Sequence, residues 1–224
     1  MTEPFALLRL LHITSPALPI GAYAYSQGLE HAVSAGWVRD EKAACAWIVG
    51  LLETSMVRLD VPVLIRLYRA WKADNEDEVR HWTYFLYANR EAAELQQQDQ
   101  HLGRALASLL VSQQYERARS WLNADITSFA TLFACVAATQ GVTERDTVLG
   151  YLWAWTENQV AAAIKLLPLG QTAGQRILHE AMDVIVLTQE RGVLIEDEDI
   201  GTLAPALAIG SALHETQYSR LFRS

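Results

Sequence analysis

The stretch Ile126-Thr-Ser-Phe-Ala-Thr-Leu-Phe-Ala-Cys-Val-Ala-Ala-Thr-Gln-Gly-Val-Thr143 contains no charged residue, and the rest of the chain must fold around it. Apolar side chains fall on every side of a helix drawn through it, which is typical of a helix buried all round. Its apolar part ends at Gly141 after roughly 15 residues, fewer than the ~20 that a membrane-spanning helix needs. The stretch therefore predicts a core helix and not a membrane span.

A second helix starts directly after this stretch. Thr143 can serve as its N-cap, and Glu144 and Asp146 in the first turn complement the helix dipole. The helix carries Tyr151 and stops before Pro168. Two helices joined by so short a connection must lie close together. We therefore expect this pair to form the centre of the molecule.

The remaining segments also follow the helical period. Apolar stripes with this period recur from Phe5 to a last helix at residues 203–212. At Asp60-Val-Pro62 we expect one helix to end and another to begin, because of the proline. Residues 112–123 indicate a loop with a short helix. No window alternates with the period of a strand. The sequence predicts an all-α, single-domain bundle of about nine to ten helices, residues 1–224, around a buried central helix pair.

Composition excludes several classes of protein. The chain has 224 residues, 51% of them apolar, and a net charge of −8, so no basic surface is expected for nucleic acid. The N-terminus lacks the basic and apolar regions of a secretory signal. Cys45 and Cys135 form no CxxC pair and are expected to be reduced and buried. These features favour a cytoplasmic protein.

No pattern of a catalytic or metal site is present. The chain has no glycine-rich loop before Lys-Ser/Thr and no Gly-x-Ser-x-Gly elbow. Its six histidines are scattered singly, unlike clustered metal ligands. The acidic run at residues 196–199 is typical of a solvated loop. We therefore expect no catalytic residue, no cofactor and no metal ligand set.

Three stretches contain residue types that a purely structural role does not explain. In the loop Ser15–Glu30, prolines and glycines fix the backbone, so Tyr23 and Tyr25 either pack into the core or point outward to a partner. Lys165 either complements its helix dipole or pairs with a Glu or a backbone carbonyl. The tail, His214–Ser224, combines aromatic side chains with arginines, which is typical of protein interfaces.

Together these stretches resemble the UreF family of urease accessory proteins. The likeness runs in order along essentially the whole chain, with departures at Ala22, Ala93 and Gln97. The family patterns are met at Leu18–Tyr23 and Ser26–Glu30, at Arg90-Glu91, Glu94-Leu95 and Gly103, at Lys165–Gln171, and at His214–Phe222.

The resemblance implies an all-α homodimer that is not itself a catalyst. Such a protein binds a UreD/UreH-type accessory protein and brings a UreG-type GTPase to apo-urease for nickel insertion; the family role also brings nickel-cation binding into consideration. Neither nucleic acid nor a membrane is implied as a partner. The expected partner-binding residues are Tyr23, Ser26, Glu30, Lys165, His214, Glu215, Gln217, Tyr218, Arg220, Leu221 and Phe222. The tail is expected to lie outside the core, so that deleting residues 215–224 leaves the fold intact.

Two other functions remain open at this point. A small helical enzyme would gather Tyr23, Glu30 and Lys165 around one concave pocket. A GTPase-activating protein would instead extend an arginine to a nucleotide held by its partner.

Overall fold

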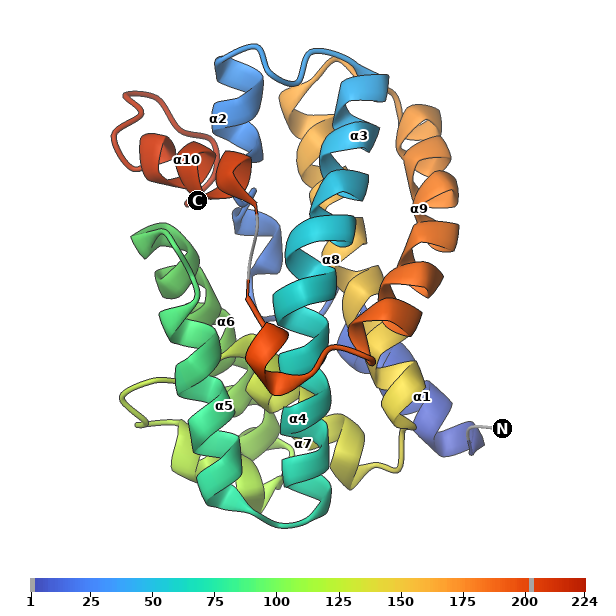
Figure 1. The fold of residues 1–224 in the computed structure, drawn as a ribbon, viewed down its shortest axis with the longest axis vertical. Helices are drawn as coiled ribbons and strands as arrows, with labels where there is room; N and C mark the ends of the chain where they lie inside the picture. The colour runs from blue at the N-terminus through green and yellow to red at the C-terminus, as the bar shows by residue number, and fades with distance from the viewer. Residues whose placement is uncertain (1–2, 202–203) are drawn as a thin grey trace.

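The computed structural model describes residues 3–201 and 204–224, and helices build its whole architecture (Figure 1). No strand occurs in the described residues, so the predicted all-α class is confirmed. The elements are α1 (Pro4–Thr14), η1 (Ala22–Ala24), α2 (Leu29–Ser34), α3 (Glu41–Leu51), the π-helix η2 (Leu52–Asp60), α4 (Val61–Lys72), α5 (Glu76–Ala88), α6 (Ala93–Ser112), η3 (Glu116–Trp121), α7 (Phe129–Thr139), α8 (Glu144–Leu166), α9 (Gln171–Gly192), η4 (Asp197–Asp199) and α10 (Pro205–His214).

The uncharged stretch forms α7, which is the core helix that the sequence predicts. All residues from Ala130 to Ala138 are buried. The helix begins at an N-cap in which the Ser128 hydroxyl accepts the N–H of Thr131 at 3.0 Å. α7 contacts α8, as predicted, but it packs more extensively against α4 and α6. The central helix pair is therefore part of a larger group of four helices.

The predicted helix break at Asp60-Val-Pro62 is wrong. α3, η2 and α4 form one continuous helical run through the middle of the molecule (Figure 1). A proline inside a helix removes one N–H and crowds the carbonyl four residues earlier. Here that carbonyl belongs to Arg58, and it accepts the N–H of Gly201 at 3.1 Å. The wider π-helical turns and this outside donor allow the helix to continue past the proline.

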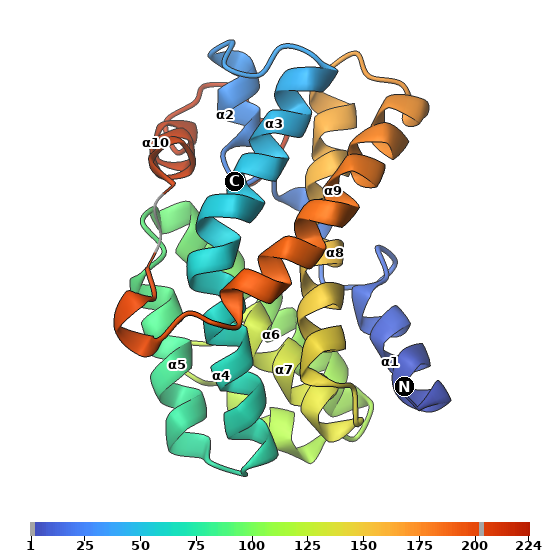
Figure 2. The same ribbon diagram turned by 45° about the vertical axis from the view of Figure 1, so that its right-hand side comes forward.

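Two apolar clusters make up the core, and α8 contributes to both. Its first half gives Val148 and Leu152 to the larger cluster, and its second half gives Val160 and Ala163 to the smaller one. α9 crosses α8 obliquely and covers it (Figure 2). The smaller cluster also contains Phe222, so the end of the chain belongs to the core.

Several local predictions can be compared with the structure. The segment at 112–123 contains the short helix η3, as predicted. Cys135 is buried as expected, whereas Cys45 is only half-buried. Leu203, the predicted start of the last helix, lies outside the described residues, and α10 begins at Pro205. No helix in the described ranges is both long enough and apolar enough to cross a membrane.

The crossing of α6 and α7 generates a prediction about Gly103. A Cβ added there would lie 2.7 Å from the backbone carbon of Ser128, closer than atoms can pack. Gly103→Ala should therefore lower the free energy of unfolding by about 1–3 kcal/mol, as overpacking does. Chemical denaturation measures the change.

Gly50→Ala is the matched control, because Gly50 also lies inside a helix and an added Cβ there meets nothing within 4 Å. It should be neutral or stabilise the protein by up to about 1 kcal/mol, since alanine favours helix. Equal unfolding midpoints for Gly103→Ala and wild type would contradict the close approach of α6 and α7.

Candidate functional site

The tail returns from α10 to lie against α2 and α6, and backbone hydrogen bonds hold it there. Both the N–H and the hydroxyl of Ser26 donate to the main-chain oxygen of Ser224, each at 2.6 Å. The N–H of Arg223 donates to the carbonyl of Ala24 at 2.8 Å. The tail is thus bound to the same loop that the sequence identifies as a contact candidate.

Glu30 is the centre of this docking. Its carboxylate accepts the backbone N–H groups of Leu221 at 2.6 Å and Phe222 at 2.8 Å. It also faces Nε2 of His214 at 3.1 Å, while Nδ1 of the same ring lies 2.9 Å from Glu94. Each ring nitrogen of His214 therefore has a carboxylate oxygen within hydrogen-bond distance, one from α2 and one from α6.

Arg220 completes the charge balance of this network. Its Nη1 lies 3.1 Å from Oε1 of Glu94. Glu30, Glu94 and His214 are buried, whereas the Arg220 side chain is 42% exposed. The two carboxyl groups therefore face the imidazole of His214, the guanidinium of Arg220 and the backbone N–H groups of the tail, which supply the hydrogen-bond partners that buried carboxyl groups require.

Lys165 lies between two aromatic rings. Its Nζ is 5.6 Å from the centre of the Tyr23 ring and 5.5 Å from that of Phe222. These distances suit cation–π attraction. Lys165 lies in the last turn of α8, where it complements the helix dipole as one of the two alternatives expected. The other alternative, pairing with a Glu or a backbone carbonyl, is not formed in the described residues. The Lys165 ammonium group thus contacts one ring from the loop and one from the tail.

The loop before α2 presents its two tyrosines differently. Tyr23 is 67% exposed, whereas Tyr25 is buried and its hydroxyl lies 3.1 Å from Nδ1 of His101. Gln27 adopts a φ of 51°, a conformation that costs energy in residues other than glycine. Its side-chain oxygen accepts the indole N–H of Trp155 at 2.6 Å, which holds the loop on α8.

The predicted contact residues divide into two groups. One group is buried and holds the tail in place; the other is solvent-exposed, or partly so, and available to a partner. Phe222 is only 6% exposed, so the prediction that the tail lies wholly outside the core is wrong. The buried group is Ser26, Glu30, His214 and Phe222, and the second group is Tyr23, Lys165, Glu215, Gln217, Tyr218, Arg220 and Leu221.

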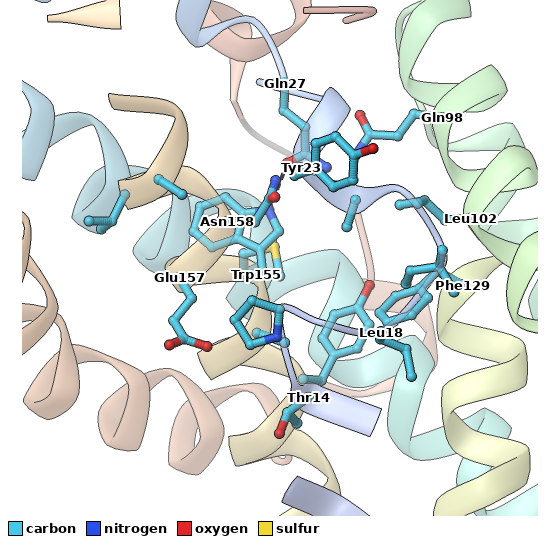
Figure 3. Close-up of a pocket in the computed structure, with 18 of the residues that line it drawn as sticks. Thr14, Leu18, Tyr23, Gln27, Gln98, Leu102, Phe129, Trp155, Glu157 and Asn158 are labelled. Atoms are coloured by element: carbon cyan, nitrogen blue, oxygen red, sulfur yellow. Dashed lines mark hydrogen bonds between the residues drawn. The ribbon is translucent and has the colours of Figure 1, made fainter. Parts of the chain in front are cut away.

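A cavity of about 310 Å³ opens beside this site, between the loop, α6 and α8 (Figure 3). Trp155, Glu157 and Asn158 of α8 lie across it from Leu102 and Phe129 (Figure 3). Of the three residues expected around an enzyme pocket, only Tyr23 lines the cavity, because Glu30 and Lys165 are held in the tail contacts. The predicted enzyme pocket is therefore not formed.

A buried ionic cluster lines the inner part of this cavity, and the sequence reasoning missed it. Arg90 donates to both oxygens of Asp60, at 2.6 and 3.2 Å. Burial raises the pKa of Asp99 to about 6, despite the nearby Arg90 and the N–H of Phe129, which donates to Asp99 Oδ1 at 2.9 Å. Asp99 Oδ2 has no hydrogen-bond partner in the described part of the chain.

One sequence signal could have revealed this cluster. Leu95, Asp99, Leu102 and Leu106 follow the helical period, so Asp99 occupies an apolar stripe. A carboxylate in that position must either be paired or change its pKa. Gln98, the neighbour of Asp99, is buried as well, and its side-chain oxygen accepts the Ser224 hydroxyl at 2.9 Å.

Comparisons with known proteins agree on one family. The UreF family profile matches residues 38–182. The urease accessory protein UreF of Alkalilimnicola ehrlichii is 47% identical over 224 residues, covering 100% of this chain and 98% of that protein. The urease accessory protein UreF of Teredinibacter turnerae is 50% identical over 218 residues, covering 97% and 98% of the two chains.

The buried position of Phe222 predicts that the tail contributes to stability. Phe222→Ala should lower the free energy of unfolding by about 3 kcal/mol or more, which is typical of a buried Phe truncated to Ala. Tyr218→Ala is the matched control: Tyr218 is fully exposed, so the change should stay within about 0.5 kcal/mol. Urea denaturation measures both, and a neutral Phe222→Ala would mean that the tail is not docked in solution.

The raised pKa of Asp99 predicts a pH-dependent stability. The folded protein holds the Asp99 proton more tightly than the unfolded chain, whose Asp pKa is about 3.9, so this contribution is lost as pH rises through about 6. Asp99→Asn removes the buried charge and keeps an oxygen for the Phe129 N–H. The free energy of unfolding of Asp99→Asn should be close to that of wild type at about pH 4 and should exceed it by up to about 3 kcal/mol at about pH 7.

Urea denaturation across this pH range measures the difference, and Asp77→Asn on the exposed start of α5 is the control. A constant difference between Asp99→Asn and wild type at every pH would show that Asp99 titrates normally.

Proposed function

This chain belongs to the UreF family of urease accessory proteins, and we propose that it is a non-catalytic cytoplasmic adaptor in urease maturation. In this role it would bind a UreD/UreH-type accessory protein, recruit a UreG-type GTPase and act, as a homodimer, in nickel insertion into apo-urease. The observation that carries the proposal is the docked tail, which presents exposed interface residue types from a rigid base.

The exposed residues of the tail and loop have the chemistry of a partner-binding surface. Tyr218 is fully exposed, and Leu221 and Tyr23 are 66% and 67% exposed, although large apolar side chains usually gain by burial. Leu221 directly precedes Phe222, whose ring shares Lys165 with Tyr23. Apolar and aromatic groups around a cation are common at the centre of protein interfaces.

Arg220 supports the same proposal through its unused donors. A guanidinium has five N–H donors in a planar fork, and one nitrogen, Nη1, contacts Glu94. Glu94 thereby fixes the Arg220 side chain. The other N–H donors of the guanidinium, which bond to nothing in the described residues, remain available to a carboxylate or carbonyl of a partner. Arginine held in this way loses little conformational entropy on binding, which is an advantage for a hot-spot residue.

The buried part of the network explains why such a surface could be specific. Glu30 fixes the backbone at Leu221 and Phe222, so the neighbouring exposed side chains keep a defined position before any partner arrives. Preorganisation lowers the entropy that binding costs. On this proposal, Glu30 and His214 shape the surface, and Tyr218, Arg220 and Leu221 make the contacts.

Co-purification tests the proposal directly. The tagged protein would be co-expressed with a UreD/UreH-type protein and a UreG-type GTPase, and the affinity of the complex measured by titration. Arg220→Ala should weaken binding by about 2 kcal/mol or more, and Leu221→Ala by at least about 1 kcal/mol, as hot-spot truncations do.

Leu194→Ala and Arg191→Ala are the matched controls, because both residues are exposed at the end of α9 and outside the tail surface. They should leave the affinity unchanged. Wild-type affinity in both tail variants would remove the tail as a partner-binding surface, and failure of the wild-type chain to form any complex would overturn the adaptor function itself.

A further inference from the structure

The 310 Å³ cavity has no role in the proposed adaptor function, yet it has the features of a ligand site. Its size is at the lower end of the range for small-molecule sites. Exposed residues, among them Pro16, Ala161 and Gln171, form its rim, and buried residues such as Leu18 and Tyr151 form its depth. A small molecule can therefore enter from solvent.

The charges around the cavity have one predominant sign. The charged residues among its described lining are Asp60, Asp99, Glu157 and Arg90, that is, three carboxylates and one guanidinium. Arg90 is engaged by both oxygens of Asp60. Arg90 attracts Asp99 as well, but neither Asp99 nor Glu157 forms an ion pair within the described residues. The excess of carboxylates makes the cavity suited to a positively charged guest and unsuited to an anion.

Both of these carboxylates experience the low polarity of the site. Burial raises the pKa of Asp99 to about 6, and burial likewise raises the pKa of Glu157. A carboxylate in an apolar environment gains more from a nearby cation than it would in water, because the attraction is less screened. The electrostatic attraction between a bound cation and Asp99 therefore acts even without direct contact.

The remaining walls are aromatic and aliphatic. The rings of Phe129 and Tyr151 stack with their centres 5.8 Å apart, and Trp155 lies on the opposite side of the cavity. Such faces attract organic cations as well as apolar groups. A strongly hydrated metal ion would find few ligands here, and the described residues contain no group of three side chains suited to hold one.

We propose that this cavity is a binding site for a compact organic cation, meaning an apolar body that carries one amidinium or ammonium group. The apolar body would lie between Trp155 and Phe129, and the positive group would be directed toward Asp99 and the Asp60–Arg90 pair. Of the residues assigned to the partner-binding surface, Tyr23 also lines the cavity, whereas the exposed tail residues do not, so the inference does not rest on the tail contacts of the adaptor function.

Isothermal titration calorimetry of the full chain with benzamidine tests the proposal, and uncharged benzamide of nearly the same shape is the reference probe. We expect saturable binding of one benzamidine per chain, at least about tenfold tighter than benzamide, because a charge-assisted contact is worth about that factor. Equal affinity for both probes, or no saturable binding of benzamidine, would overturn the proposal. Stronger binding of Mg²⁺ than of benzamidine would identify a metal site instead.

Two variants locate the site. Asp99→Asn should weaken benzamidine binding by about tenfold and leave benzamide unaffected, since only the charge is removed. Ala154→Phe, on the wall formed by α8, should abolish binding of both probes by filling the cavity. Asp77→Asn, which lies on α5 outside the cavity lining, should bind like wild type. Undiminished benzamidine binding in folded Asp99→Asn would place the ligand elsewhere and refute the assignment.

A pH series gives an independent readout. Asp99 faces Asp60, Arg90 and Tyr151, and Glu157 lies farther along the same cavity. Benzamidine affinity should fall as pH decreases through about 6, because Asp99 then takes up a proton. Asp99→Asn should lose most of this dependence. An affinity that does not change between neutral and acidic pH would contradict the role of the carboxylates.

Discussion

A buried carboxylate requires hydrogen-bond donors, and Glu30 finds most of its donors in the tail. One oxygen accepts the N–H of Leu221, and the other accepts that of Phe222 and faces His214. Without these groups a negative charge would remain buried and unpaired, which costs several times more than an ordinary lost hydrogen bond. The start of α2 and the end of the chain are therefore folded as one unit, although nearly the whole sequence separates them.

The loop before α2 connects this unit to the cavity. The Tyr23 ring contacts the ammonium group of Lys165 on α8 and also lines the cavity. Gln98 likewise lines the cavity and accepts the hydroxyl of Ser224. Trp155 holds the loop through Gln27, at a backbone conformation that would not persist without such contacts. Tyr23 and Gln98 therefore form a wall that the docked tail and the cavity share.

Asp60 shows how a local rule can be overridden by a distant contact. A proline two residues later predicts a helix break, and the rule is sound for an isolated helix. In the folded protein Gly201 pairs with the carbonyl that Pro62 displaces, and Arg90 pairs with the Asp60 carboxylate. Both partners come from remote segments. The outcome is a continuous helix with a π-helical section, whose residues Ser55, Met56 and Asp60 line the cavity.

Information carried by neighbouring residues was sufficient for the fold class, the buried α7, the cap at Thr143 and the family. Periodicity and capping act over a few residues, so they can be read directly from the chain. Only the tertiary structure decided which motif residues are buried and which are exposed: Tyr25 and Phe222 are inside, whereas Tyr23 and Leu221 are outside. It also brought together Asp60, Arg90 and Asp99. Their pairing and pKa depend on distances between separate helices, which no local pattern encodes.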